Sequence, residues 1–236
     1  MCTVTYLPLS TSSFILTHNR DEHHTRTIAT LPEKRIVHGK EIVFPKDEQG
    51  GGTWFASGKK FTICLLNGGF EKHIRKPSYR HSRGLVIPDF FKWENIDRFI
   101  HEYDFEDLEP FTLIILEHAN QQVHEIVSDE IRVTYTIMDD SLPAIWSSTT
   151  LYTDHDRDKR RIWFEQWNRE HPTDSQKDII DFHMSQQDEA ANEGIRINRD
   201  SILFTVSLTS VLKDESNKVS LYYEDLLQHK KKIIVI

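Results

Sequence analysis

The chain has 236 residues, of which 38% are hydrophobic and 28% charged, and its formal net charge is −8. This length and composition suit a globular protein, and we expect residues 1–236 to form a single domain. The acidic balance disfavours nucleic acid as a partner, because a nucleic-acid-binding protein needs a basic face. No apolar run approaches the length of a membrane-spanning helix, so no membrane span is predicted.

Cysteine usage and the start of the chain indicate a reducing compartment. The two cysteines, Cys2 and Cys64, do not make a disulfide framework. The start of the chain also lacks the basic segment and apolar core of a secretory signal. We therefore expect a cytoplasmic protein in which Cys64 fills the core of an apolar strand.

Residues 1–7 and 14–22 are predicted to form the two strands of a hairpin. If the initiator Met1 is removed, Cys2 carries a free α-amine. The pKa of such an amine, near ~8, leaves part of it neutral and able to take the thiol proton. Because the thiolate is the nucleophilic form of cysteine, the hairpin has the parts of an N-terminal nucleophile.

The returning strand of this hairpin ends in the polar run Asn19-Arg20-Asp21-Glu22, which a tight turn brings beside Cys2. The fixed charge of Arg20 favours the thiolate, and Asp21 can hold the ammonium group that forms. The register leaves open whether Asp21 or Glu22 faces Cys2. Two structural alternatives also stay open: Cys2 as an ordinary buried strand residue, and the polar run as a solvated turn with a local ion pair.

The rest of the chain is predicted to consist of short strands and three helices. The predicted strands cover residues 35–44, 54–57, 60–66, 111–117, 121–127, 132–138, 144–148, 201–212, 218–223 and 233–236. Helical spacing predicts helices over residues 85–103, 156–170 and 176–187. Residues 72–83 are predicted to form an exposed basic loop, residues 188–199 a polar connector, and residues 230–232 a lysine run that protects a sheet edge. Short turns between strands indicate antiparallel sheets with helices on their outer faces, an α+β fold.

Four motifs occur together in the first third of the chain. They are Met1-Cys2-Thr3, Asn19-Arg20-Asp21-Glu22, Gly51-Gly52-Thr53-Trp54 and Asn67. In this order they resemble the NRDE family, also called the Transport and Golgi Organization protein 2 family. That family is similar to the choloylglycine and penicillin V acylase branch of the N-terminal nucleophile hydrolases. The resemblance implies a four-layer αββα sandwich of two antiparallel sheets.

The resemblance also implies roles for single residues. An Asn at the end of the strand that precedes Gly68 would donate its amide to an oxyanion hole, and Asn67 occupies this place. Asn-Gly-Gly is equally common as a plain turn. Thr53 and Trp54 would line a pocket beside the nucleophile. The candidate catalytic residues are Cys2, Arg20, Asp21 and Asn67, and the candidate substrate-binding residues are Asn19, Glu22, Thr53, Trp54 and Ser148.

The chain departs from the acylase pattern in two places. Ser148 stands where these acylases carry a second Asn, and residues 204–209 contain no Arg, although the acylases have one in a late strand. Both differences concern substrate anchoring and catalysis more than the fold.

Several histidines and acids near the first hairpin could be mistaken for metal ligands. However, the adjacent His23 and His24 are expected to point to opposite sides of an extended strand, so no metal site is predicted. The run Asp154-His155-Asp156 is better explained as the acidic start of a helix.

The sequence therefore predicts an N-terminal cysteine amidohydrolase that cleaves a linear C–N amide bond of a small acylated molecule without a cofactor. The alternative is a non-catalytic carrier or trafficking factor for an apolar ligand. Members of the resembled family have been linked to Golgi organisation and to haem handling, and haem would then be bound cargo that needs an axial donor and an apolar pocket.

Overall fold

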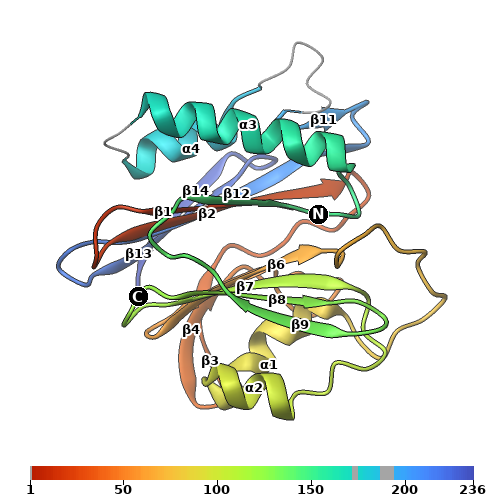
Figure 1. Cartoon of the computed structure of the whole chain (residues 1–236). Helices are drawn as coiled ribbons and strands as arrows, with labels where there is room; N and C mark the ends of the chain where they lie inside the picture. Colours follow the sequence, from red (N-terminus) through yellow and green to blue (C-terminus); the bar gives the residue numbers. More distant parts are fainter. Residues whose placement is uncertain (1, 172–174, 187–193) are drawn as a thin grey trace. The chain divides into compact units, whose positions relative to one another are not determined.

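The computed structural model describes residues 2–171, 175–186 and 194–236 (Figure 1). The chain divides into two compact units, residues 1–26 with 140–235, and residues 27–139 with Ile236. Each unit contains one seven-stranded antiparallel sheet. That all 236 residues form a single domain stays a prediction.

The sheet of the first unit joins the two ends of the chain. Its strand order is β10-β1-β2-β12-β13-β14, and the short β11 pairs with β12. Every residue of β1 before Pro8 is buried, so both faces of this strand are covered. The strands are β1 (Cys2–Pro8), β2 (Phe14–His23), β10 (Ala144–Ser147), β11 (Asn198–Arg199), β12 (Leu203–Lys213), β13 (Val219–Asp225) and β14 (Lys230–Val235).

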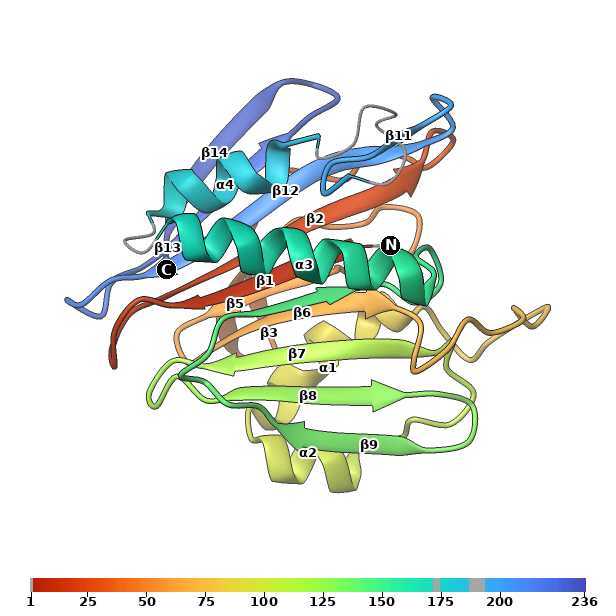
Figure 2. The same cartoon turned by 45° about the horizontal axis from the view of Figure 1, so that its top comes forward.

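Two helices cover one face of this sheet, α3 (Asp154–Glu170) and α4 (Gln176–Met184) (Figure 2). Each begins with a capping box, formed by Thr153 with Asp156 in α3 and by Ser175 with Asp178 in α4. The apolar cluster between the helices and the sheet consists of Leu7 and Ile15 from strands, Phe164, Ile179 and Phe182 from the helices, and Ile195 from the segment before β11. Both predicted helices are confirmed, although α4 ends earlier than expected.

The sheet of the second unit has its strands in sequence order, β3 to β9. They are β3 (Glu33–Val37), β4 (Lys40–Phe44), β5 (Phe55–Gly58), β6 (Phe61–Asn67), β7 (Phe111–Glu117), β8 (Val123–Ser128) and β9 (Val133–Ile137). The prediction of one strand over residues 35–44 was wrong. His38 and Gly39 both adopt positive φ and turn this segment into the β3–β4 hairpin.

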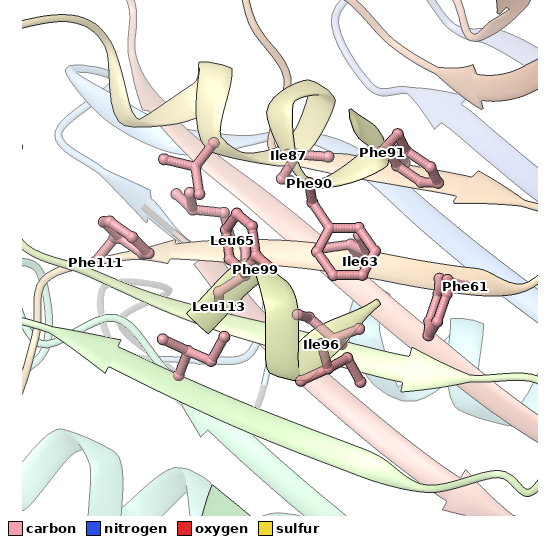
Figure 3. Packing of buried hydrophobic residues seen from close by; sticks show 14 of the residues in the cluster. Phe61, Ile63, Leu65, Ile87, Phe90, Phe91, Ile96, Phe99, Phe111 and Leu113 are labelled. Atoms are coloured by element: carbon pink, nitrogen blue, oxygen red, sulfur yellow. The ribbon is translucent and has the colours of Figure 1, made fainter. Parts of the chain in front are cut away.

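The predicted helix over residues 85–103 is also divided. A short 3-10 turn η1 (Arg83–Leu85) leads into α1 (Val86–Trp93), and α2 (Ile96–Glu102) follows. Glu94 ends α1 in the left-handed conformation, and the Asn95 side chain then caps α2. Figure 3 shows Phe90 and Phe99 of these helices packed with residues of β6 and β7, which form the apolar core on this face of the sheet.

The end of the chain differs from the prediction in one detail. The lysine run does not precede the last strand but belongs to it, because β14 begins at Lys230 and pairs with β13 up to Val235. Part of the polar connector over 188–199 falls outside the described residues, and its last two residues form β11. Along the described part of the chain, no helix is both long enough and apolar enough to cross a membrane.

Candidate functional site

The register of the first hairpin places the nucleophile candidate opposite an arginine. Cys2 of β1 pairs with Arg20 of β2. Paired residues of antiparallel strands share a face, and neighbours along a strand alternate between faces. Cys2, Arg20 and Glu22 therefore lie on one face of the sheet and Asp21 on the other. Of the two acids, Glu22 and not Asp21 shares the face of Cys2, and its carboxylate lies 3.5 Å from the Arg20 guanidinium.

Cys2 is deeply buried, with 2% of its surface exposed. Its carbonyl oxygen accepts a hydrogen bond from the Ser148 backbone N–H at 3.0 Å. Burial raises the pKa of the Cys2 thiol to about 11, and the carboxylates of Asp21 and Glu22 act in the same direction. With Met1 attached, Cys2 is consequently a neutral thiol at physiological pH.

Asp21 is held by two hydroxyl groups on the face that carries α3 and α4. The Tyr152 hydroxyl donates to Asp21 Oδ2 at 2.7 Å, and the Thr205 hydroxyl donates to Oδ1 at 2.6 Å. Burial raises the pKa of Asp21, and the nearby Arg160 charge opposes this shift. The carboxyl group of Asp21 is thus fixed from β12 and from the residue before the α3 cap.

Arg160 of α3 is fully buried and connects this helix with β1. Its guanidinium donates hydrogen bonds to the Thr3 hydroxyl and to the Gly194 carbonyl. It also lies over the Tyr152 ring, 3.6 Å from the ring centroid. Sequence reasoning missed this residue, although the spacing of Arg160 four residues before the inward-facing Phe164 could have indicated it.

Two further predicted residues are near Cys2: Asn19 belongs to the first hairpin, and Ser148 contacts Cys2 in space. Asn19, predicted to bind substrate, donates its amide to the carbonyl oxygens of His183 and Ile195, at 2.8 and 3.2 Å. It is thus engaged in holding β2 to the segments above it. Ser148 contacts Cys2 through its backbone, and its hydroxyl lies 2.9 Å from the Thr150 hydroxyl.

In the motif Gly51-Gly52-Thr53-Trp54 of the second unit, the local structure explains each glycine. Gly51 has φ +74°, which favours glycine. A side chain at Gly52 would start 2.2 Å from the backbone of Gly84, so this crossing of two chain segments requires glycine. The crossing is closed by a hydrogen bond from the Thr53 N–H to the Gly84 carbonyl at 2.9 Å.

Thr53 and Trp54, predicted to line a pocket, are both buried. The Thr53 hydroxyl donates to the Phe55 carbonyl at 2.9 Å and accepts from the Phe55 N–H. The Trp54 carbonyl accepts from the Leu65 N–H at 2.9 Å. These contacts fix the entry into β5, and a role of either residue in binding stays a prediction.

Asn67 is the last residue of β6 and pairs with Phe111 of β7. It is half-buried, and the following Gly68 adopts φ +95°. The Gly68 N–H donates to the Pro110 carbonyl at 2.9 Å. Asn67 thus ends a strand at a tight turn, and its role as oxyanion donor stays a prediction.

The histidines of the first hairpin lie differently from the expectation. His23 ends β2, and the rings of His23 and His24 contact each other with centroids 4.3 Å apart. The expectation that they point apart was wrong, because the strand ends between them. Within the described ranges, no group of three His, Cys, Asp or Glu residues is placed to hold a metal ion.

Residues 1–229 match the model of the family described as Transport and Golgi organisation 2. The chain belongs to this family. This confirms the resemblance drawn from the four motifs, and the match extends far beyond the first third of the chain. No curated protein matches the sequence of this family member.

Among solved structures, this member of the Transport and Golgi organisation 2 family is similar to a variant of conjugated bile acid hydrolase from Clostridium perfringens. The TM-score is 0.57 at 8% sequence identity, over 99% of this chain and 92% of that chain. At this identity the likeness concerns the fold. The predicted α+β fold with two antiparallel sheets and helices is confirmed.

Proposed function

We propose that the chain is an N-terminal cysteine amidohydrolase, which cleaves a linear C–N amide bond of a small acylated molecule after Met1 has been removed. The observation that carries the proposal is the pairing of Cys2, at the start of β1, with Arg20 of β2. The likeness of the fold to a bile acid hydrolase supports the same class of reaction.

Removal of Met1 supplies the base that the thiol needs. A thiol with a pKa of about 11 is ionised to a negligible extent at neutral pH. The freed α-amine of Cys2, with a pKa near ~8, can accept the thiol proton, and Arg20 favours the resulting thiolate. Processing would thus convert a buried inert thiol into a nucleophile.

The reaction then proceeds in two steps, acylation of Cys2 and hydrolysis of the resulting thioester. The Cys2 sulfur attacks the acyl carbonyl, and its proton passes to the α-amine. A hydrogen-bond donor must stabilise the oxyanion, and Asn67 is the residue that the family resemblance suggests for this role. The ammonium group, oriented by Asp21, returns the proton to the leaving amine as the C–N bond breaks and a thioester forms. Water, deprotonated by the same amine, attacks the thioester and releases a carboxylic acid and the free thiol.

Intact mass and covalent labelling test the proposal together. Chains with and without Met1 are incubated with amide-linked and thioester acyl probes, and adducts are located by peptide mapping. We expect an acyl adduct on Cys2 of the Met-free chain, none on the Met-bearing chain, and none on a Cys2→Ala variant. A Cys64→Ala variant is the matched control and should label like the parent. A Met-free chain that takes up no acyl group would refute the proposal.

If Met1 is retained in the native protein, Cys2 has no free α-amine as a base, and the second candidate becomes the better one, a carrier for an apolar ligand such as haem. Titration with haem distinguishes the two candidates. A Soret shift that is lost in Cys2→Ala or in a His variant supports the carrier, whereas an unchanged spectrum rejects it.

A further inference from the structure

The segment that leads into α1 is strongly basic, although the chain as a whole is acidic. Residues 71–83 hold five Lys or Arg and one Glu. Two of these cations have acidic partners of their own, since Lys76 pairs with Glu130 and Arg80 with Asp104. The other basic side chains of this segment include three that gather around a single carboxylate.

That carboxylate belongs to Glu109, just before β7. Its Oε1 atom lies 3.4 Å from Arg83 Nη2, 3.5 Å from His73 Nε2 and 3.8 Å from Arg75 Nε. One acidic group thus faces two guanidinium groups and an imidazole. We call His73, Arg75, Arg83 and Glu109 the basic cluster.

The charges of the basic cluster do not cancel. Within it, Arg75 and Arg83 against Glu109 leave one positive charge without counting His73, and the neighbouring Lys72 and Glu71 offset each other. An excess charge of this kind attracts anions, and it is screened less where its groups are sheltered from water.

The basic cluster is sheltered on one side and open on the other. The side chains of His73 and Arg83 are 13% and 14% exposed, whereas Arg75 is 77% exposed. His73 Nδ1 is buried and has no hydrogen-bond partner in the part of the chain that the structure describes. Buried polar atoms normally have a partner, so an atom without one indicates a place for water or a ligand.

A single carbonyl oxygen joins the basic cluster to the turn after Asn67. The Pro110 carbonyl accepts hydrogen bonds from Arg83 Nη1 at 2.8 Å and from the Gly68 N–H at 2.9 Å. Gly68 directly follows Asn67, the predicted oxyanion donor. A group bound at the cluster would therefore lie near the end of β6 that carries Asn67.

We propose that His73, Arg75 and Arg83 bind an anionic ligand that presents a phosphate or carboxylate group. This inference goes beyond the proposed function and does not depend on it. Guanidinium groups suit this task because their planar fork of N–H donors matches the oxygens of such anions. Glu109 holds the arginines in place between binding events.

Binding is tested with inorganic phosphate on the full chain. The His73 ring resonances are followed by NMR at constant ionic strength. We expect a saturable shift, with affinity about twofold to fivefold weaker in Arg75→Gln, because that exposed side chain supplies one ion pair. Arg98→Gln removes an exposed ion pair on α2 and is the matched control, expected to bind as the parent. A shift that does not saturate, or that is equal in both variants, would overturn the anion site.

Discussion

Burial decides the chemistry of Cys2 at the scale of the single residue. Because the pKa of the thiol in the Met-bearing chain is about 11, only about one thiol in ten thousand is ionised at pH 7. We expect its alkylation by iodoacetamide to rise about tenfold per pH unit between pH 7 and 10, with an inflection above that range. The Met-free chain should show its inflection near ~8, where the α-amine loses its proton. Alkylation rates measured by mass spectrometry across this pH range check both expectations.

The alkylation experiment uses a Cys64→Ala background, so that every adduct reports on Cys2. The same chain unfolded in urea provides a reference, since an exposed thiol titrates near ~8.5. Equal reactivity of the two chains at pH 7 would contradict the role assigned to the freed amine.

The hydroxyl of Tyr152 gives a second prediction for a single residue. Tyr152→Phe removes a donor from the buried Asp21 carboxyl group. We expect a loss of about 1–3 kcal/mol in the free energy of unfolding by urea, because an acceptor is left unsatisfied away from water. Tyr222→Phe is the matched control. It removes a hydroxyl that donates to Glu224 on the partly exposed face of β13, and it should change stability by about 0.5 kcal/mol or less. Equal losses in the two variants would argue against a buried Asp21 network.

At the scale of the element, the two glycines before Thr53 are predicted to differ in their tolerance of a side chain. Gly51→Ala meets no atom within 4 Å but must keep φ +74°, which costs about 1–2 kcal/mol. Gly52→Ala would place its Cβ 2.2 to 2.6 Å from the backbone of Gly84 and Leu85, and backbone cannot yield as a flexible side chain does. We expect a loss of more than about 3 kcal/mol for Gly52→Ala, because one chain segment must move. Urea denaturation of both variants measures the difference, and similar losses would contradict the tight crossing.

The helices and strands also show which features a sequence pattern can predict and which it cannot. Alternation and helical spacing were sufficient to find most strands and the two helices of the first unit, because those segments bury one regular face. They failed at residues 35–44 and 85–103, where His38 and Glu94 adopt left-handed conformations. Gly39 and Asn95, which directly follow these two residues, are the turn and capping types that could have signalled both breaks.

For the candidate site, the sequence could predict contacts only between residues that are close along the chain. The hairpin predicts that Arg20 lies beside Cys2, because both belong to neighbouring strands joined by a short turn. The partners of Asp21 could not be predicted, since Tyr152 and Thr205 come from distant segments that only the folded sheet brings together. The burial of Arg160 was missed because arginine normally indicates an exposed position, although its spacing from Phe164 places both residues on one face of α3.

At the scale of the whole molecule, the Cys2 hairpin depends on the other end of the chain. Within the sheet of the first unit, β2 lies between β1 and β12, and β12 pairs with it from Leu203 to Lys213. Without β12, the long strand β2 would be an unpaired edge and the Thr205 hydroxyl would be missing from Asp21. The environment of Cys2 therefore requires residues 203–213, which are far from Cys2 in the sequence.

Two truncations test this dependence in the Met-bearing chain with Cys64→Ala. A chain of residues 1–200 lacks β12, β13 and β14, and we expect Cys2 to react with Ellman's reagent as fast as an unfolded thiol. A chain of residues 1–228 lacks only β14, which pairs with β13 alone, so Cys2 should stay as unreactive as in the full chain. Circular dichroism establishes that the longer truncation keeps its strands. Protection of Cys2 in the 1–200 chain would contradict this prediction, because it would show that the first hairpin is stable without β12.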